Sequence, residues 1–239
     1  MRATVARVVD PFLNQVDRAI GTGYSAVLYG SAARGDFIPG RSDINLMLVL
    51  DEVVAPTLRS LGPAFAAWRK SMPEPPLLVS RSEWSRASDA FPIEITDMRL
   101  SYQILRGSDP LEGVQVERAD LRKALEREFR GKLLRLRQGY ATYAPEPGAL
   151  GSLGLQSAAT ILVLLRGVLT VVGRPVPVDT IELSTTAADA VGFEPGYLLH
   201  VVRHRADREW RCPAPEFENY MDAVEQTARF VDQLQLGDQ

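Results

Sequence analysis

The 239-residue sequence has few of the residues that form disulfides or bind transition metals. Its one cysteine, Cys212, excludes an internal disulfide framework and a cysteine-rich zinc site. The two histidines, His200 and His204, leave little scope for histidine-based metal chemistry. Any metal bound by this chain would therefore be held by carboxylates.

The sequence also has little net charge and no long uninterrupted apolar run. Lys and Arg number 27 against 30 Asp and Glu, and the net charge of −3 argues against a protein that binds nucleic acid mainly by electrostatics. The N-terminus has no apolar signal-peptide core. The longest apolar stretch, 149–173, is interrupted by polar residues and glycines. It favours a buried helix, or two helices broken near 151–154, over a membrane span. We expect a cytoplasmic protein with no membrane partner.

Short β-rich runs alternate with helical patterns in the first half of the chain. Asp10 followed by Pro11 predicts the start of a helix. A second helix is predicted over 55–70. Strands are predicted over 25–29, 43–50, 76–80, 92–98 and 102–106. Strands interleaved with helices indicate an α/β or α+β sheet domain.

The strand signal ends near residue 117. Apolar residues from Leu121 to Tyr140 recur at spacings of three and four, which predicts a helix. Three more helices are predicted over 149–173, 195–208 and 217–236. We therefore predict a sheet domain over 1–113 and an all-helical domain over 114–239, with the ligand cleft at their junction.

The segment 28–46, LYGSAARGDFIPGRSDINL, carries the most specific chemical signal. Gly30 ends a strand and has no side chain, so a phosphate can approach its backbone closely. Ser31 adds a hydroxyl at a helix N-terminus, where N–H groups favour anions. Asp43 and Asn45 lie two apart on the next predicted strand, so both side chains leave the same face. Two oxygen ligands so placed suit Mg²⁺.

This arrangement resembles the nucleotidyltransferase superfamily typified by DNA polymerase β, in particular its aminoglycoside adenylyltransferase-like and minimal members. The family signature is Gly-Ser followed by Asp-x-Asp and a third carboxylate on a later strand. The resemblance covers roughly residues 10–110. It implies an α/β (α+β) nucleotidyltransferase fold with a mixed, mainly antiparallel sheet, and a helical C-terminal domain beside it.

The resemblance also implies a reaction. An acceptor hydroxyl attacks the α-phosphate of a nucleoside triphosphate, pyrophosphate leaves, and one or two Mg²⁺ ions stabilise the attacking and leaving oxygens. The residues that would bind the nucleotide are Gly30, Ser31, Arg34 and Ser42.

The carboxylates that the resemblance assigns to metal binding and catalysis come from two segments. Asp43, Asn45 and Glu94 would bind the metal. Asp43 would act in catalysis with a third carboxylate from 92–98, where Glu94 is the first choice and Asp97 the second. On a strand, residues three apart face opposite ways, so only one of the two could join Asp43.

The sequence departs from the family pattern at Asn45, which replaces the second aspartate of Asp-x-Asp. An amide brings no negative charge, so a second cation should bind more weakly. Three outcomes are open: slow catalysis with one ion, rescue by Asp36 or another carboxylate, or a fold that binds nucleotide without chemistry.

Three functions therefore stand as hypotheses. The first is Mg²⁺-dependent transfer of a nucleoside monophosphate, most simply AMP from ATP, to a hydroxyl of a small molecule or protein. The second is a catalytically impaired nucleotide-binding or regulatory protein. The third is an interaction protein that forms a homodimer through its helical domain.

Several cations have two interpretations each. Arg34 is either a solvated loop residue or a charge that reaches the triphosphate. Lys132 and Arg135, in a basic helical segment, either belong to a solvated helix face or turn toward nucleotide phosphate. Arg166, within the apolar stretch, either forms a structural ion pair or lines the cleft.

Overall fold

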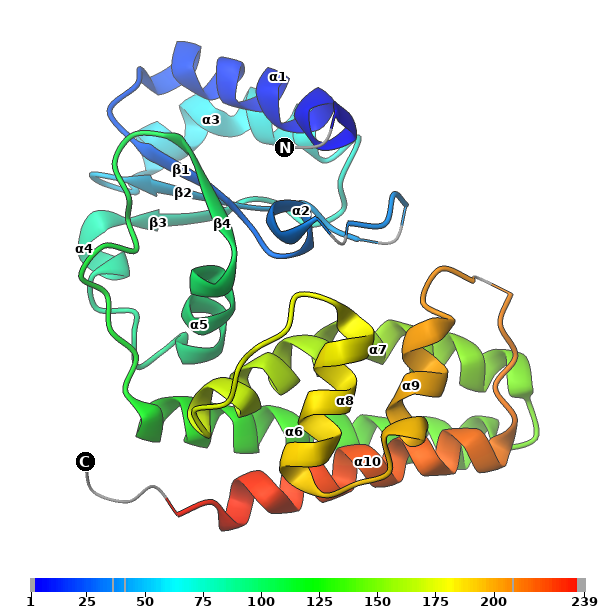
Figure 1. Cartoon of the computed structure of the whole chain (residues 1–239). Coiled ribbons are helices and arrows are strands. Elements are labelled where there is room, and N and C mark those ends of the chain that lie inside the picture. Colours follow the sequence, from blue (N-terminus) through cyan, green and yellow to red (C-terminus); the bar gives the residue numbers. More distant parts are fainter. Residues whose placement is uncertain (1–2, 36, 41, 208, 236–239) are drawn as a thin grey trace. The chain divides into compact units, whose positions relative to one another are not determined.

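The computed structural model describes residues 3–35, 37–40, 42–207 and 209–235. The chain divides into two compact units, of which the first ends at Gln115 and the second begins at Val116 (Figure 1).

A four-stranded sheet organises the first unit. Its strands are β1 (Ser25–Tyr29), β2 (Asn45–Leu50), β3 (Leu77–Ser80) and β4 (Tyr102–Arg106). Their order is β3-β2-β1-β4; β1 is antiparallel to β2 and β4, whereas β2 and β3 are parallel. The predicted mixed, mainly antiparallel sheet is therefore confirmed.

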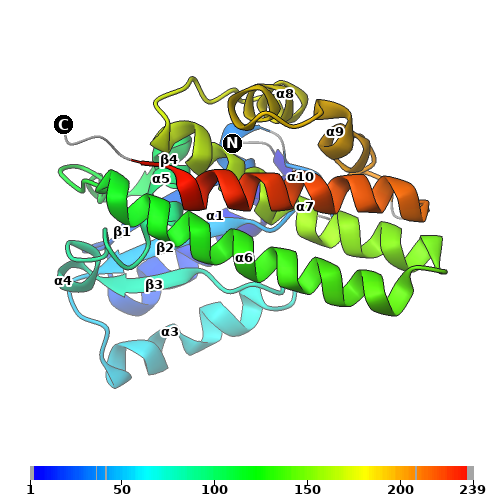
Figure 2. The ribbon, with the colours of Figure 1, turned by 90° about the horizontal axis from the view of Figure 1, so that it is seen from below.

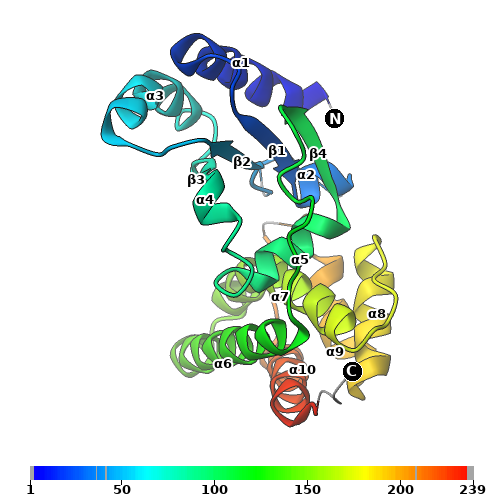
Figure 3. The ribbon, with the colours of Figure 1, turned by 90° about the vertical axis from the view of Figure 1, so that its left-hand side faces the viewer.

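Five helices accompany this sheet. They are α1 (Ala3–Ile20), α2 (Ser31–Arg34), α3 (Ala55–Trp68), α4 (Arg81–Trp84) and α5 (Pro92–Leu100). In Figures 1 and 3, α1 and α3 lie on one side of the sheet and α4 and α5 on the other. The first helix begins seven residues before the predicted cap at Asp10, because Val5 and Val9 continue its buried face upstream and Pro11 is accommodated inside the helix.

The two faces of the sheet differ in what they bury. Leu28 pairs with Leu46, and both side chains enter a core formed with α1 and α3. The neighbouring pair, Tyr29 and Asn45, must face the opposite side because side chains alternate along a strand. We call the side of the sheet that carries Tyr29 and Asn45 the site face.

One predicted strand is wrong: residues 92–98 belong to helix α5. Pro92 stands in the first turn, where a missing N–H costs nothing, and the amide of Ile95 donates to the carbonyl of Phe91 (3.0 Å). The alternating isoleucines Ile93 and Ile95 imitate a strand, but four consecutive residues from Ile95 to Met98 are buried. The sheet position beside β1 is filled by β4 instead.

Over the described residues 116–207 and 209–235, the regular structure of the second unit is entirely helical. Its helices are α6 (Arg118–Tyr143), α7 (Pro147–Val171), α8 (Thr180–Val191), α9 (Pro195–Arg203) and α10 (Ala214–Gln233). Figure 2 shows α10 running alongside α6, and ion pairs join them, including Arg130 to Asp232 (2.9 Å) and Arg137 to Glu225 (2.6 Å). The sequence did not predict α8, although Asp179 caps it by accepting from the amides of Ile181 and Glu182.

Helix α7 is the centre of this unit and is continuous, so the alternative of two helices broken near 151–154 is wrong. Among the described helices it is the one with the length and apolar composition of a membrane span. It packs here against α6, α8, α9 and α10. Glycines allow close approach: a Cβ at Gly151 would stand 2.1 Å from the carbonyl oxygen of Trp210, and one at Gly167 would stand 2.8 Å from a methyl of Leu125.

Candidate nucleotide site

The turn that follows β1 depends on glycine. Gly30 has φ 69° and ψ −151°, a conformation that side-chain-bearing residues rarely adopt. Its carbonyl accepts from the amides of Ala33 (3.0 Å) and Arg34 (2.9 Å), which closes the single turn of α2. The Ser31 hydroxyl makes no hydrogen bond within the described ranges, so it is available to a ligand.

This turn lies directly against the beginning of β2. A Cβ built on Gly30 would stand 2.5 Å from Nδ2 of Asn45, so the asparagine amide packs on the bare Cα of the glycine. The register pair of Tyr29 with Asn45 explains the contact, because it places the first residue of β2 opposite the last residue of β1. The two halves of the sequence motif therefore meet on the site face.

Asp43 and Ser42 precede β2, which begins at Asn45 and not at the predicted residue 43. The alternation still continues through Ile44, which is buried in the same core as Leu46 and leaves Asp43 on the side of Asn45. Asp43 is exposed, and its carboxylate forms no hydrogen bond or ion pair with the described part of the chain. Ser42 Oγ accepts from the amide of Ile38 (2.9 Å), so this hydroxyl helps to close the loop. Asp36, the proposed rescuing carboxylate, lies outside the described residues.

Glu94 and Asp97 share one face of α5, since residues three apart on a helix are neighbours. The prediction that they face opposite ways is wrong, because it depended on a strand. The pKa of Tyr29 is raised to about 12. Burial is the largest cause, and the negative charges of Glu94 and Asp97 add to it. Tyr29 is thus a site-face residue that sequence reasoning missed; its signal was its position just before Gly-Ser.

Asp97 is held by Arg34. Nη1 of Arg34 lies 3.3 and 3.2 Å from the two carboxylate oxygens, and the side chains are only 6% and 10% exposed. The interpretation of Arg34 as a solvated loop cation is therefore wrong. The ion pair joins α2, which carries the Gly30–Ser31 turn, to α5, whereas Glu94 on the same helix face is exposed to solvent.

These residues do not fit a centre for two divalent cations. Asn45 is neutral, Asp97 is neutralised by a guanidinium, and the described residues contain no group of three or more His, Cys, Asp or Glu side chains that could hold a metal. Asp43 is the exposed carboxylate next to the Gly30–Asn45 contact. These ligands together carry less negative charge than two divalent cations require.

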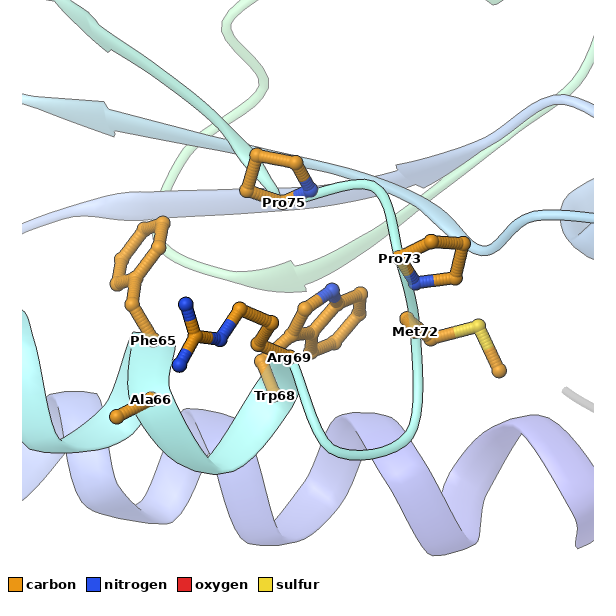
Figure 4. Close-up of a pocket in the computed structure, with 7 residues that line it drawn as sticks. All are labelled: Phe65, Ala66, Trp68, Arg69, Met72, Pro73 and Pro75. Carbon is orange, nitrogen blue, oxygen red and sulfur yellow. The ribbon is translucent and has the colours of Figure 1, made fainter.

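A hollow of about 380 Å³ lies elsewhere in the first unit, around the end of α3 (Figure 4). It is lined by Phe65, Ala66, Trp68, Arg69, Met72, Pro73 and Pro75. Trp68 belongs to the core shared with α1, on the side of the sheet away from the site face, and its indole N–H donates to the carbonyl of Glu74 (2.7 Å). Arg69 is the one charged residue that lines it, so the hollow has too few positive charges and hydrogen-bond donors to bind a triphosphate.

Two of the three cations singled out in the helical domain have a described environment within that unit. Nζ of Lys132 donates to Oγ1 of Thr160 (3.4 Å), and burial, together with the charge of Arg135, lowers the pKa of Lys132. Arg166 is 2% exposed in α7. A contact of any of the three with nucleotide stays a prediction.

Comparisons with known proteins give a likeness of structure and not of sequence. No family model matches the chain, and no curated protein matches its sequence. Among solved structures it is similar to spectinomycin adenyltransferase AAD(9) from Enterococcus faecialis, crystallised with ATP and spectinomycin. The TM-score is 0.56 at 10% identity over 94% of this chain and 99% of that one. The chain therefore has the fold that its motif predicted: the α/β fold of that adenyltransferase, with a mixed sheet followed by a helical part.

Proposed function

We propose that this protein is a nucleotidyltransferase that moves a nucleoside monophosphate, AMP from ATP, onto a hydroxyl of a small molecule. The observation that carries the proposal is the contact between the Gly30–Ser31 turn and the beginning of β2, with Asp43 exposed beside it. Support comes from a whole-chain likeness to an adenyltransferase crystallised with ATP and spectinomycin, which favours a small-molecule acceptor over a protein.

The residues of the site divide the work between binding and proton transfer. Gly30 lets a phosphate approach the backbone, and the Ser31 hydroxyl donates to a phosphate oxygen. Glu94, the exposed carboxylate of α5, accepts the proton of the acceptor hydroxyl. A bond forms between the acceptor oxygen and the α-phosphorus, the bond to the β-phosphate oxygen breaks, and pyrophosphate leaves. Asp97 is unsuited to act as the base because its carboxylate is nearly buried and already paired with Arg34.

A second function is favoured by two specific observations. Asn45 removes one carboxylate from the motif, and the Arg34–Asp97 ion pair engages another. Both changes weaken the electrostatic stabilisation on which phosphoryl transfer depends. A protein that binds nucleoside triphosphate as a signal, with little or no turnover, is the alternative.

Transfer of label from ATP carrying ³²P at the α-phosphate tests the proposal directly. The protein is incubated with Mg²⁺ and a panel of aminocyclitol and aminoglycoside acceptors that begins with spectinomycin. We expect labelled acceptor, and loss of at least 100-fold of the rate in Asp43→Ala. Glu52→Ala is the matched control, because Glu52 is an exposed carboxylate just beyond the opposite end of β2.

The outcomes separate the two functions. ATP binding without labelled product on any acceptor would favour the nucleotide-binding protein. Equal rates in Asp43→Ala and the parent would refute the assignment of the site, and the absence of ATP binding would refute both functions.

A further inference from the structure

We propose that this site binds its nucleoside triphosphate with one divalent cation and not two, and that the guanidinium of Arg34 supplies at Asp97 the positive charge that a second cation would bring. The inference rests on the proposed function. It selects one ion where the sequence motif leaves one or two open, and it makes Arg34 a fixed part of the nucleotide site.

The charges on the site face support this stoichiometry. Asp43 and Glu94 are exposed carboxylates, and Glu94 is the proposed base for the acceptor hydroxyl. Asn45 contributes a neutral amide that cannot bridge two dications as a carboxylate does, and Asp97 is already neutralised by Arg34. A dication brought to the Asp97 oxygens would also meet a guanidinium 3.2 Å from them, and two like charges in a nearly buried site repel strongly. Among the described residues, Asn45 therefore offers a second ion no bridging carboxylate, and the guanidinium on Asp97 makes the potential there unfavourable.

The geometry ties this charge to the nucleotide turn. Tyr29 pairs with Asn45, Asn45 packs on Gly30, and Asp97 lies near enough to Tyr29 to raise its pKa. Arg34 ends the one-turn helix that begins at Ser31. A guanidinium stays protonated at every physiological pH and does not dissociate, unlike a bound ion. The site thus has a permanent positive charge one helical turn from the residues that face the phosphates.

Equilibrium dialysis counts the ions without requiring turnover. The protein is dialysed against Mn²⁺ and a non-hydrolysable ATP analogue, and the excess of each over the outer compartment is measured. The parent is compared with Asn45→Asp, Arg34→Gln and the double variant. We expect a ratio of excess manganese to excess nucleotide of about 1 in the parent and in Asn45→Asp, rising toward 2 in the double variant.

Arg106→Gln is the matched control for loss of an arginine ion pair. Nη2 of Arg106 lies 3.2 Å from Oδ2 of Asp17 in the same unit. Arg106 stands opposite Ala26 in the β1–β4 ladder, at the end of β1 away from the turn. We expect it to leave the ratio at about 1. If Arg34→Gln does not fold, the parent and Asn45→Asp still decide.

The failures of the two proposals are distinguishable. A ratio of 2 in the parent, or in Asn45→Asp with Arg34 in place, would overturn the one-ion inference while leaving the transferase proposal intact. A double variant that folds and keeps a ratio of 1 would overturn the role of Arg34. The absence of excess nucleotide in the parent would overturn both.

Discussion

Replacement of Gly30 by alanine tests whether the turn after β1 is built for close approach. The backbone there, at φ 69° and ψ −151°, is nearly exclusive to glycine, and forcing a side chain into such a conformation costs about 1–3 kcal/mol. The new Cβ would stand 2.5 Å from Nδ2 of Asn45, so the asparagine must move away from the turn. We expect Gly30→Ala to lower the free energy of unfolding by about 2 kcal/mol.

The larger effect should be on nucleotide binding. The methyl group and the displaced Asn45 amide would stand where we place the phosphates, and a loss of about 1.4 kcal/mol corresponds to a tenfold weaker Kd. We expect at least a tenfold weakening of ATP affinity, measured by isothermal titration calorimetry, with unfolding followed in urea.

Gly21→Ala is the control, because Gly21 also has positive φ (77°) but a Cβ there meets nothing within 4 Å. It should cost about 1 kcal/mol of stability and leave ATP affinity unchanged. If both variants bound ATP as the parent does, the turn would not be the phosphate site. If Gly30→Ala and Gly21→Ala lowered the free energy of unfolding equally, the collision with Asn45 would make no contribution to the loss of stability.

Three further predictions concern other side chains. Glu94→Gln should lower the turnover rate at least 100-fold, because an amide cannot accept the proton of the acceptor hydroxyl. Asp97→Asn should lower the free energy of unfolding by about 3 kcal/mol, because it removes the carboxylate that pairs with the buried guanidinium of Arg34. Initial rates and urea denaturation measure the two effects, and an unchanged turnover rate in Glu94→Gln would contradict the assignment of Glu94 as the base. The pKa of Tyr29 is raised from 10.0 to about 12, so the unfolded chain loses this proton first and the free energy of unfolding falls as pH rises from 10 to 12. Urea denaturation across that pH range should show a smaller fall in Tyr29→Phe than in the parent. Equal falls in the two proteins would refute the raised pKa. Asp179→Ala should lower the free energy of unfolding of the helical unit by about 1 kcal/mol through loss of the α8 cap. The control Asp189→Ala breaks an exposed ion pair with Arg174 and should change the free energy of unfolding, measured in urea, by less than half as much.

Most of the sheet could be predicted from short apolar runs because its two central strands are buried. β1 matches its prediction at both ends, and β2 differs only at its beginning. The edge strands β3 and β4 were recognisable from β-rich segments flanked by Pro76 and Gly107. The sheet type, mixed and mainly antiparallel, came from the resemblance, and the order of the strands was not predicted, because periodicity carries no information on which strands are neighbours.

Helix α5 could not be predicted because its seven-residue signal fits two periods. Ile93 and Ile95 alternate with Glu94 as on a strand, and only tertiary packing on the site face decides for a helix. This error changed the interpretation of the site: a strand separates Glu94 from Asp97, whereas a helix brings both toward Tyr29. The Arg34–Asp97 pair was equally out of reach, since 63 residues separate its members in sequence.

The helical unit was recognisable as helical, but α8 was not. Apart from Leu183, its buried residues are small or polar, such as Ser184 and Ala187, so they form no conspicuous apolar stripe. Its beginning at Asp179 and its end at Gly192 carry ordinary capping signals that a search for stripes overlooks.

The glycines along α7 have a consequence for how this unit tolerates change during evolution. At Gly151 and Gly167 even the smallest side chain would collide with a carbonyl oxygen of the opposing segment or with a leucine methyl. Position 151 is therefore closed to neutral drift, because the backbone oxygen that it faces cannot move aside, whereas the end of the Leu125 side chain opposite Gly167 can turn away. Distant descendants of this chain should keep a glycine at position 151 after the apolar residues around it have been exchanged.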